Sequence, residues 1–234
     1  MVTNEMPDNP NPPPPKLRVH CFVDGFNLYH ALDWFNGGKT TEECHKYRKY
    51  KWISLRDLAT CFVGGNEELV GVDLFTTVPT SDVGKQMRHR CFIRAQECHG
   101  VNVTRGAFRE KEVRCEALCK GGFTIRIEKQ TDVNIALKML DLAYQDKFDK
   151  AILISGDTDL IPAIKLIRLR WPKKQVVAVL PIGRRQYGLD VRHACNGEIK
   201  MNESHLQRSL MPEQVIDEKN GVRVNRPIEY LPFA

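Results

Sequence analysis

A chain of 234 residues with 42% hydrophobic residues can bury a full core, and its length favours one α/β domain with appendages over two complete domains. Its 35 Lys and Arg residues exceed its 29 Asp and Glu residues and give a net charge of +6, which is modest for the whole chain but unevenly distributed along it. No apolar run reaches the length of a membrane span, and no signal peptide precedes the eight cysteines. We therefore expect a cytoplasmic protein with reduced thiols and no membrane partner.

The basic residues are concentrated in residues 160–189, which contain no acid. Such a stretch suits nucleic acid as a partner. A solvated helix face followed by a basic loop explains the same residues equally well. The basic positions are Lys165, Arg168, Arg170, Lys173, Lys174, Arg184 and Arg185.

The chain begins with a proline-rich leader, residues 1–16, whose composition cannot bury enough apolar surface to offset its ordering entropy, so we expect disorder. Residues 17–23 are predicted as the first strand, and a helix follows to about Trp34. Residues 37–50 then form a polar insertion with mixed basic and aromatic side chains. These side chains either track a nucleic-acid backbone or belong to a solvent-exposed loop.

Four further strands are predicted at residues 69–77, 101–105, 151–154 and 175–180. They alternate with helices at the spacing typical of a parallel sheet with right-handed crossovers, which predicts an α/β fold around a mainly parallel five-stranded sheet. The helix from Val133 to Tyr144 is apolar almost all round and is predicted to be buried. A second insertion, residues 110–127, contains one arm of a hairpin. We expect one domain over residues 17–201 and a packed or partner-seeking tail over residues 202–234.

An apolar run, Ala151–Ile154, ends abruptly before Gly156, Asp157 and Asp159. Ligands of open parallel α/β sheets bind at the carboxyl ends of strands, so two carboxylates there indicate a cation or phosphate site. The alternative is structural, because Asp157 can cap the next helix and Asp159 can stabilise its positive end.

Two more acids are predicted at the same edge of the sheet: Asp24 with Asn27 after the first strand, and Asp132 in the first turn of a helix with Thr131 as its N-cap. Carboxylates brought close together repel unless a cation compensates them. Hard oxygen ligands select Mg²⁺ or Mn²⁺ rather than zinc. Such a cluster can activate water and neutralise a phosphodiester, so the pattern predicts metal-assisted phosphodiester hydrolysis.

Three motifs in this order resemble the NYN domain of the PIN-like nuclease superfamily, in particular its LabA-like branch. They are Val23-Asp24-Gly25-Phe26-Asn27-Leu28, Glu128-Lys129-Gln130-Thr131-Asp132-Val133 and Ser155-Gly156-Asp157-Thr158-Asp159. The resemblance spans roughly residues 17–180 and implies a PIN-like three-layer α/β/α sandwich with a metal-dependent ribonuclease activity. Leu160 stands where an aromatic residue is common in that family.

The resemblance also assigns roles to individual residues. Asp24 and Asp157 would be core metal ligands, and Asp132 and Asp159 would complete the acidic pocket. Asn27 would position water or phosphate by hydrogen bonding. Lys129 and Ser155 are lesser candidates beside the pocket. Apart from the resemblance, the ribonuclease hypothesis has RNA phosphates held on either side of the pocket by Arg88, Arg94, Arg184 and Arg185, and Lys129 is a further RNA-binding candidate.

Three alternatives remain open, and one of them is a phosphatase or DNA nuclease that uses the same metals. The chain could be a non-catalytic RNA-binding or regulatory module of the same fold, with tails that recruit a protein partner or a second copy. Cys115 and Cys119 have the spacing of half a structural zinc site, whose second half would have to come from scattered residues such as Cys91, Cys98 or His99, so zinc is the weaker metal expectation.

Overall fold

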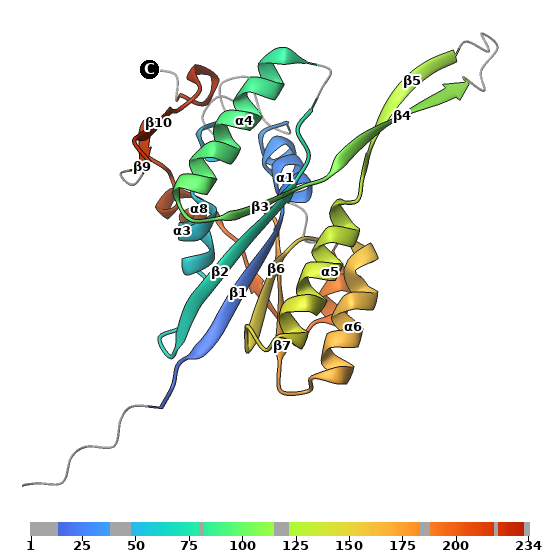
Figure 1. The fold of residues 1–234 in the computed structure, drawn as a ribbon, viewed down its shortest axis with the longest axis vertical. Coiled ribbons are helices and arrows are strands. Elements are labelled where there is room, and N and C mark those ends of the chain that lie inside the picture. Colours follow the sequence, from blue (N-terminus) through green and yellow to red (C-terminus); the bar gives the residue numbers. More distant parts are fainter. Residues whose placement is uncertain are drawn as a thin grey trace, which may run out of the picture.

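The computed structural model describes residues 14–37, 48–79, 82–114, 122–182, 188–217 and 220–231. Its centre is one sheet with the strand order β3-β2-β1-β6-β7-β8, in which every neighbouring pair is parallel. Figure 1 shows the sheet between layers of helices. The strands are β1 (Leu17–Asp24), β2 (Glu67–Thr76), β3 (Asn102–Arg105), β6 (Lys150–Ile154), β7 (Gln175–Leu180) and β8 (Gly197–Lys200).

The sheet confirms the α/β architecture and the parallel arrangement, but the predicted number of five strands was wrong. The sixth strand, β8, has the sequence GEIK and pairs with β7 at the edge of the sheet. Its residues are only partly buried or exposed, so it lacks the apolar run that marks a strand buried on both faces.

Helices cover both faces of the sheet. One layer contains α1 (Gly25–Gly37), α3 (Leu55–Thr60), α4 (Val83–Cys98) and α8 (Glu203–Arg208), and the other contains α5 (Thr131–Tyr144), α6 (Ile161–Arg170) and α7 (Leu189–Ala194). Side chains alternate along β1, so Val23 packs with Leu28 of α1 on one face, and Phe22 packs with Ile135 of α5 on the other. None of the helices in the described ranges has the length and apolar character needed to cross a bilayer.

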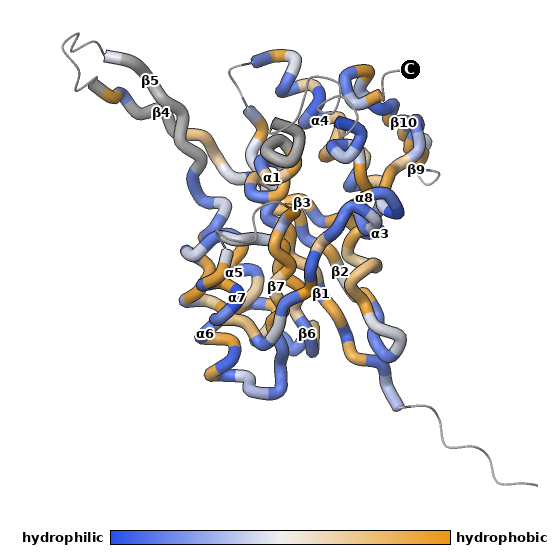
Figure 2. Tube along the Cα trace, turned by 180° about the vertical axis from the view of Figure 1, so that it is seen from behind, coloured by the Kyte–Doolittle hydropathy of each residue, from blue (hydrophilic) through white to orange (hydrophobic). Residues whose placement is uncertain are grey.

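The prediction that α5 is buried all round was wrong. Ile135 and Met139 are fully buried against the sheet, but Val133 and Leu137 are each 60% exposed and Tyr144 is 80% exposed. Figure 2 shows hydrophobic stretches in the central strands and also in α5 and α6. A helix in the outer layer of a three-layer fold packs on one side only, so its outward positions stay exposed whatever residues occupy them.

Two appendages complete the fold. The hairpin of β4 (Ala107–Arg114) and β5 (Gly122–Lys129) contains the predicted arm and extends away from the sheet (Figure 1). After α8, strands β9 (Gln214–Asp217) and β10 (Val222–Asn225) pair and are followed by the 3-10 helix η4 (Ile228–Tyr230). This C-terminal segment packs on fully buried Trp52, whose Nε1 donates to the carbonyl of Pro212 at 2.8 Å. The leader up to residue 13 and most of the insertion at 37–50 lie outside the described residues.

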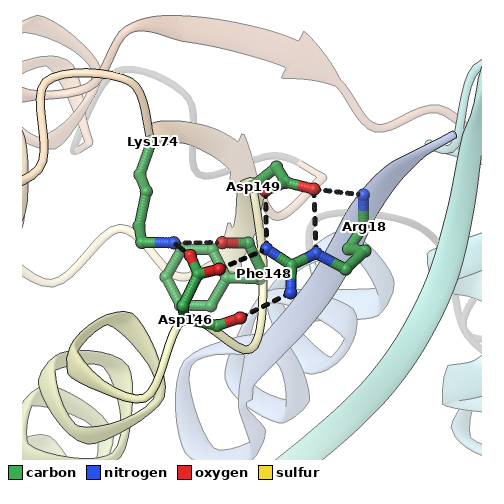
Figure 3. Close-up of polar contacts among 5 residues, drawn as sticks. All are labelled: Arg18, Asp146, Phe148, Asp149 and Lys174. Atoms are coloured by element: carbon green, nitrogen blue, oxygen red, sulfur yellow. Dashed lines mark hydrogen bonds and ion pairs between the residues drawn. The ribbon is translucent and has the colours of Figure 1, made fainter. Parts of the chain in front are cut away.

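An ion-pair network ties β1 to β6 at the amino-terminal edge of the sheet (Figure 3). The Arg18 guanidinium donates to both carboxylate oxygens of Asp149, at 3.0 and 2.8 Å, and to Asp146 at 3.1 Å. Lys174 is only 6% exposed and donates to Asp146 and to the carbonyl of Phe148. One of the basic residues predicted to face a polyanion is therefore a structural residue.

Candidate metal centre

Three acids from separate segments meet at the carboxyl edge of the sheet. Asp24 is the last residue of β1, and Asp157 follows β6, which pairs with β1 in parallel so that both strands end at the same edge. Asp132 lies in the first turn of α5. One oxygen of each carboxylate lies within 4.8 Å of the other two. The structure therefore brings together three of the predicted acids.

Asp24 is held in one orientation by two donors. It is 3% exposed, its Oδ1 accepts from the backbone N–H of Asn27 at 2.9 Å, and its Oδ2 accepts from Ser155 Oγ at 2.8 Å. The β1–α1 connection needs Gly25, because a Cβ there would lie 2.8 Å from the carbonyl oxygen of Phe75. The turn after β1 thus positions Oδ1, and Ser155, directly after β6, positions Oδ2.

Ser155 and Asn27 join the two acidic loops. The fully buried Ser155 Oγ accepts from the N–H of Asp157 at 3.0 Å while it donates to Asp24. The Oδ1 of Asn27 accepts from the N–H of Gly156 at 3.4 Å. These contacts fix the relative positions of Asp24 and Asp157.

Burial raises the pKa of the Asp24 carboxyl from its ordinary 3.8 to about 7. The hydrogen bonds from Asn27 and Ser155 favour the charged form and oppose this rise, whereas the negative charges of Asp132 and Asp157 add to it. A cation between the three carboxylates would remove both the repulsion and the cost of burying the charge.

The donor set fits Mg²⁺ or Mn²⁺. All three side chains offer carboxylate oxygens, which are the hard ligands that these ions prefer. Oxygens bound to one Mg²⁺ lie about 3 to 4 Å apart, because each lies ~2 Å from the ion. Carboxylates whose oxygens are already within 4.8 Å reach that spacing by small side-chain rotations.

Asp159 is outside this group of three. Its side chain is exposed, and its N–H donates to Asp157 Oδ1 at 2.9 Å, so Asp157 caps the 3-10 helix η2 (Thr158–Leu160). Asp157 therefore caps η2 and not the predicted helix α6, whose N-cap is Leu160 without a side-chain hydrogen bond. Asp157 also belongs to the cluster of three acids. Leu160 is fully buried in the core, as a packing residue.

The predicted N-cap of α5 was wrong. Gln130, with a φ of 77°, precedes the helix, and Thr131 is its first residue. Thr131 is 4% exposed, and its Oγ1 lies 3.4 Å from Thr77 Oγ1. The N-terminus of α5 is thereby fixed against the end of β2.

Of the predicted RNA-binding residues, two form ion pairs with acids, one is exposed, and two lie outside the described residues. Arg88 forms an ion pair with Glu229 at 2.7 Å, and Arg94 forms one with Glu97 at 3.4 Å. Lys129 is exposed at the end of β5. Arg184 and Arg185 lie outside the described residues.

The zinc expectation also depends on residues that lie outside the described ranges, Cys115 and Cys119. Cys91 Sγ donates to the carbonyl of Asn225 at 3.1 Å. Over the parts of the chain that the structure describes, the three-carboxylate cluster is the single group with metal-ligand spacing.

Sequence reasoning missed a cavity of about 660 Å³ whose lining includes the two residues that follow Asp24. Its wall begins at Gly25 and Phe26, directly after Asp24, and includes Tyr29 and His30 of α1. These residues lie in the first two turns of α1, directly after Asp24. Their closeness to Asp24 in the sequence was the one signal that could have identified them.

Comparisons with known proteins agree with this architecture. A curated relative, 6-hydroxy-3-succinoylpyridine 3-monooxygenase from Pseudomonas putida, is 22% identical over 186 residues, which are 65% of this chain and 56% of the relative. The chain thus spans about half the length of that relative. A crystal structure of a protein of unknown function from Vibrio parahaemolyticus matches 82% of this chain and 97% of its own with a TM-score of 0.52 and 17% identity, a likeness of fold alone. The family model of the NYN domain matches residues 18–202, and the chain therefore belongs to the NYN domain family of the PIN-like nuclease superfamily.

Proposed function

We propose that the chain is a metal-dependent ribonuclease that hydrolyses RNA phosphodiester bonds at Asp24, Asp132 and Asp157. The observation that carries this proposal is the convergence of these three carboxylates, from three separate segments, to within 4.8 Å. Membership of the NYN family supports the reaction class. The assignment to its LabA-like branch and a cytoplasmic location remain predictions from the sequence.

The three carboxylates would hold Mg²⁺ or Mn²⁺, which when bound lowers the pKa of water and neutralises phosphate charge. In the overall reaction the water oxygen bonds to phosphorus, the P–O ester bond breaks, and the leaving oxygen takes up a proton. Ser155 and the Asn27 N–H keep the Asp24 oxygens oriented during this exchange. The exposed Asp159 is proposed to act on substrate or solvent at the rim rather than in the cluster.

Cleavage of labelled single-stranded RNA, structured RNA, DNA and a phosphomonoester, each with Mg²⁺ or Mn²⁺, tests the proposal. We expect RNA to be cut, and EDTA to stop the reaction. Asp24→Asn and Asp157→Asn should lose activity, whereas Asp141→Asn, at an exposed position of α5, should not. Equal cleavage by Asp24→Asn and wild type would refute the site.

The same assay separates the alternative of a non-catalytic RNA-binding module. RNA affinity that is unchanged by divalent metal, with no cleavage of any substrate, would favour that alternative. A binder of phosphates gains nothing from three uncompensated carboxylates, and one of these, Asp24, is buried. This cost is the physical reason for placing hydrolysis first.

The name of the curated relative favours a second candidate, oxygenation of a small aromatic ring. We place it below hydrolysis because the clustered donors are all carboxylates and the sequence has no dinucleotide-binding glycine fingerprint. Oxygen uptake with NADH and a hydroxylated pyridine, compared between wild type and Asp24→Asn, tests this candidate. Uptake that requires Asp24 would favour oxygenation.

A further inference from the structure

The cavity of about 660 Å³ is lined by residues that adjoin two of the three acids in the sequence or in space. On one side it begins at Gly25 and Phe26, the two residues after Asp24. On another side it reaches Thr77, whose hydroxyl lies 3.4 Å from that of Thr131, the residue before Asp132. Its volume lies within the range of about 300–1,000 Å³ typical of ligand pockets. A ligand in the cavity would therefore contact residues next to Asp24 and a threonine that contacts the residue before Asp132.

One wall of this cavity is aromatic. Phe26 is 47% exposed, and its ring centroid lies 4.2 Å from that of His30 at an angle of 66°. Tyr29 lies edge-on to His30 at 5.7 Å. Phe108, from the base of the β4–β5 hairpin, lines the cavity as well. An exposed aromatic ring at the mouth of a concave site is suited to stacking with a flat ligand.

The charged side chains of the lining are mostly basic. Four cationic residues face one carboxylate, that of Glu229, which gives a net charge of +3 (4 − 1). Lys51 Nζ lies 4.4 Å above the Tyr29 ring, and Arg88 pairs with Glu229. The four cations are Arg48, Lys51, Lys85 and Arg88. A ligand that stacks on the aromatic wall and pairs with the basic residues must combine a flat aromatic ring with an anionic group. A nucleotide has both.

Part of the cavity wall comes from outside the NYN match. Glu229 and Tyr230 line it from η4, beyond residue 202 where the NYN match ends. Arg48 and Lys51 come from the 3-10 helix η1 (Arg48–Lys51), next to the insertion at 37–50. The bases of a duplex are paired and stacked, so only an unpaired base can enter a pocket of this kind.

We propose that this cavity binds one nucleotide of single-stranded RNA beside the scissile phosphodiester, with its base against Phe26 and its phosphate held by Arg48 and Lys51. The position relative to the cut bond rests on the proposed function. The binding itself does not, because the aromatic and basic walls exist without any catalysis.

The test measures binding of a short fluorescein-labelled oligouridine to the full chain by anisotropy, in EDTA so that metal-dependent cleavage cannot occur. Phe26→Ala should weaken binding at least about fivefold, and Phe26→Trp should restore it. Tyr144→Ala is the matched control, because Tyr144 is 80% exposed at the far end of α5. Thermal unfolding of each variant checks that the fold is intact.

A second variant probes the phosphate contact through its salt dependence. Arg48→Gln should reduce the slope of log K against log salt by about 0.7, the value expected when one contact to single-stranded nucleic acid is lost. Lys173→Gln, at an exposed position near the opposite edge of the sheet, should leave the slope unchanged.

Unchanged binding in both Phe26→Ala and Arg48→Gln would overturn the proposal. So would equal affinity for duplex RNA, or displacement of the oligouridine by UMP at equal concentration, which would assign the site to free nucleotides. If binding depends on Phe26 but the wild type cuts no RNA with Mn²⁺, the nucleotide site stands and the hydrolytic proposal falls. If the wild type cuts RNA with Mn²⁺ but Phe26→Ala binds the oligouridine as well as the wild type, the hydrolytic proposal stands and the nucleotide site falls.

Discussion

Replacing Asp24 by Asn should make the protein more stable at neutral pH while it abolishes activity. The pKa of Asp24 is raised in the folded protein, from 3.8 to about 7. The folded protein therefore holds a proton that the unfolded chain releases between about pH 4 and 7, and wild-type stability falls as the pH rises through this interval. Above about pH 7, the free energy of unfolding is lowered by the full cost of burying the charged Asp24 carboxylate.

The size of the effect follows from the difference between the two pKa values. A rise from 3.8 to about 7 corresponds to ~4 kcal/mol at pH 8. An Asn side chain avoids this cost and keeps the acceptor for the Asn27 N–H, but its amide group meets the Ser155 hydroxyl, at a cost of about 1–2 kcal/mol. The net gain is ~2 kcal/mol, or about 4–8 °C in Tm for a chain of this length.

Thermal unfolding in EDTA at pH 8 and at pH 5 measures this gain, which should shrink at pH 5 because wild-type Asp24 is then protonated. Adding Mn²⁺ should raise the Tm of the wild type and not that of Asp24→Asn, since a ligand stabilises only a fold that binds it. Asp141→Asn, at an exposed position, should behave like the wild type at both pH values. A variant that is less stable than wild type at pH 8, or equally stabilised at both pH values, would refute the reasoning.

Three further predictions concern other parts of the structure. Asp157→Asn should remove the Mn²⁺-induced rise in Tm and lower RNA cleavage by at least about 10- to 100-fold in single-turnover assays. Arg18→Met should lower the free energy of unfolding by about 1 kcal/mol in urea at pH 7, because these ion pairs are partly exposed and screened by solvent. Because Arg18 holds the pKa of Asp149 at about 2, below its ordinary 3.8, this stabilisation is present above pH 4 and is lost as the pH falls towards 2. Gly25→Ala should reduce both stability and cleavage, since its Cβ would lie 2.8 Å from a backbone oxygen, whereas Gly122→Ala, with nothing within 4 Å, should affect neither.

The acids at the strand ends could be predicted because adjacent residues determine which part of a strand is buried and where it leaves the core. An apolar run such as Ala151–Ile154 gains free energy only when it is buried, and a carboxylate directly after it must lie where the strand leaves the core. The parallel order of the strands then places Asp24 and Asp157 at one edge, because β1 and β6 pair in parallel.

Other features could not be predicted because neighbours in space determine them. The outward residues Val133 and Leu137 of α5 are apolar, so periodicity does not distinguish them from the buried Ile135. The edge strand β8 is built from GEIK, whose pairing with β7 is set by the backbone rather than by apolar side chains. Phe26 and Tyr230 line the same cavity although they are about 200 residues apart in the sequence.

The sequence by itself determined the α/β class, the NYN resemblance and the acids at the strand ends, because local polarity and strand period are properties of adjacent residues. The packing of the helices on the sheet places Asp159 outside the cluster of Asp24, Asp132 and Asp157, and it brings basic and aromatic residues from distant segments together around one cavity. Angstrom-scale distances between side chains depend on how helices pack on the sheet. That packing is a property of the whole core rather than of any one segment.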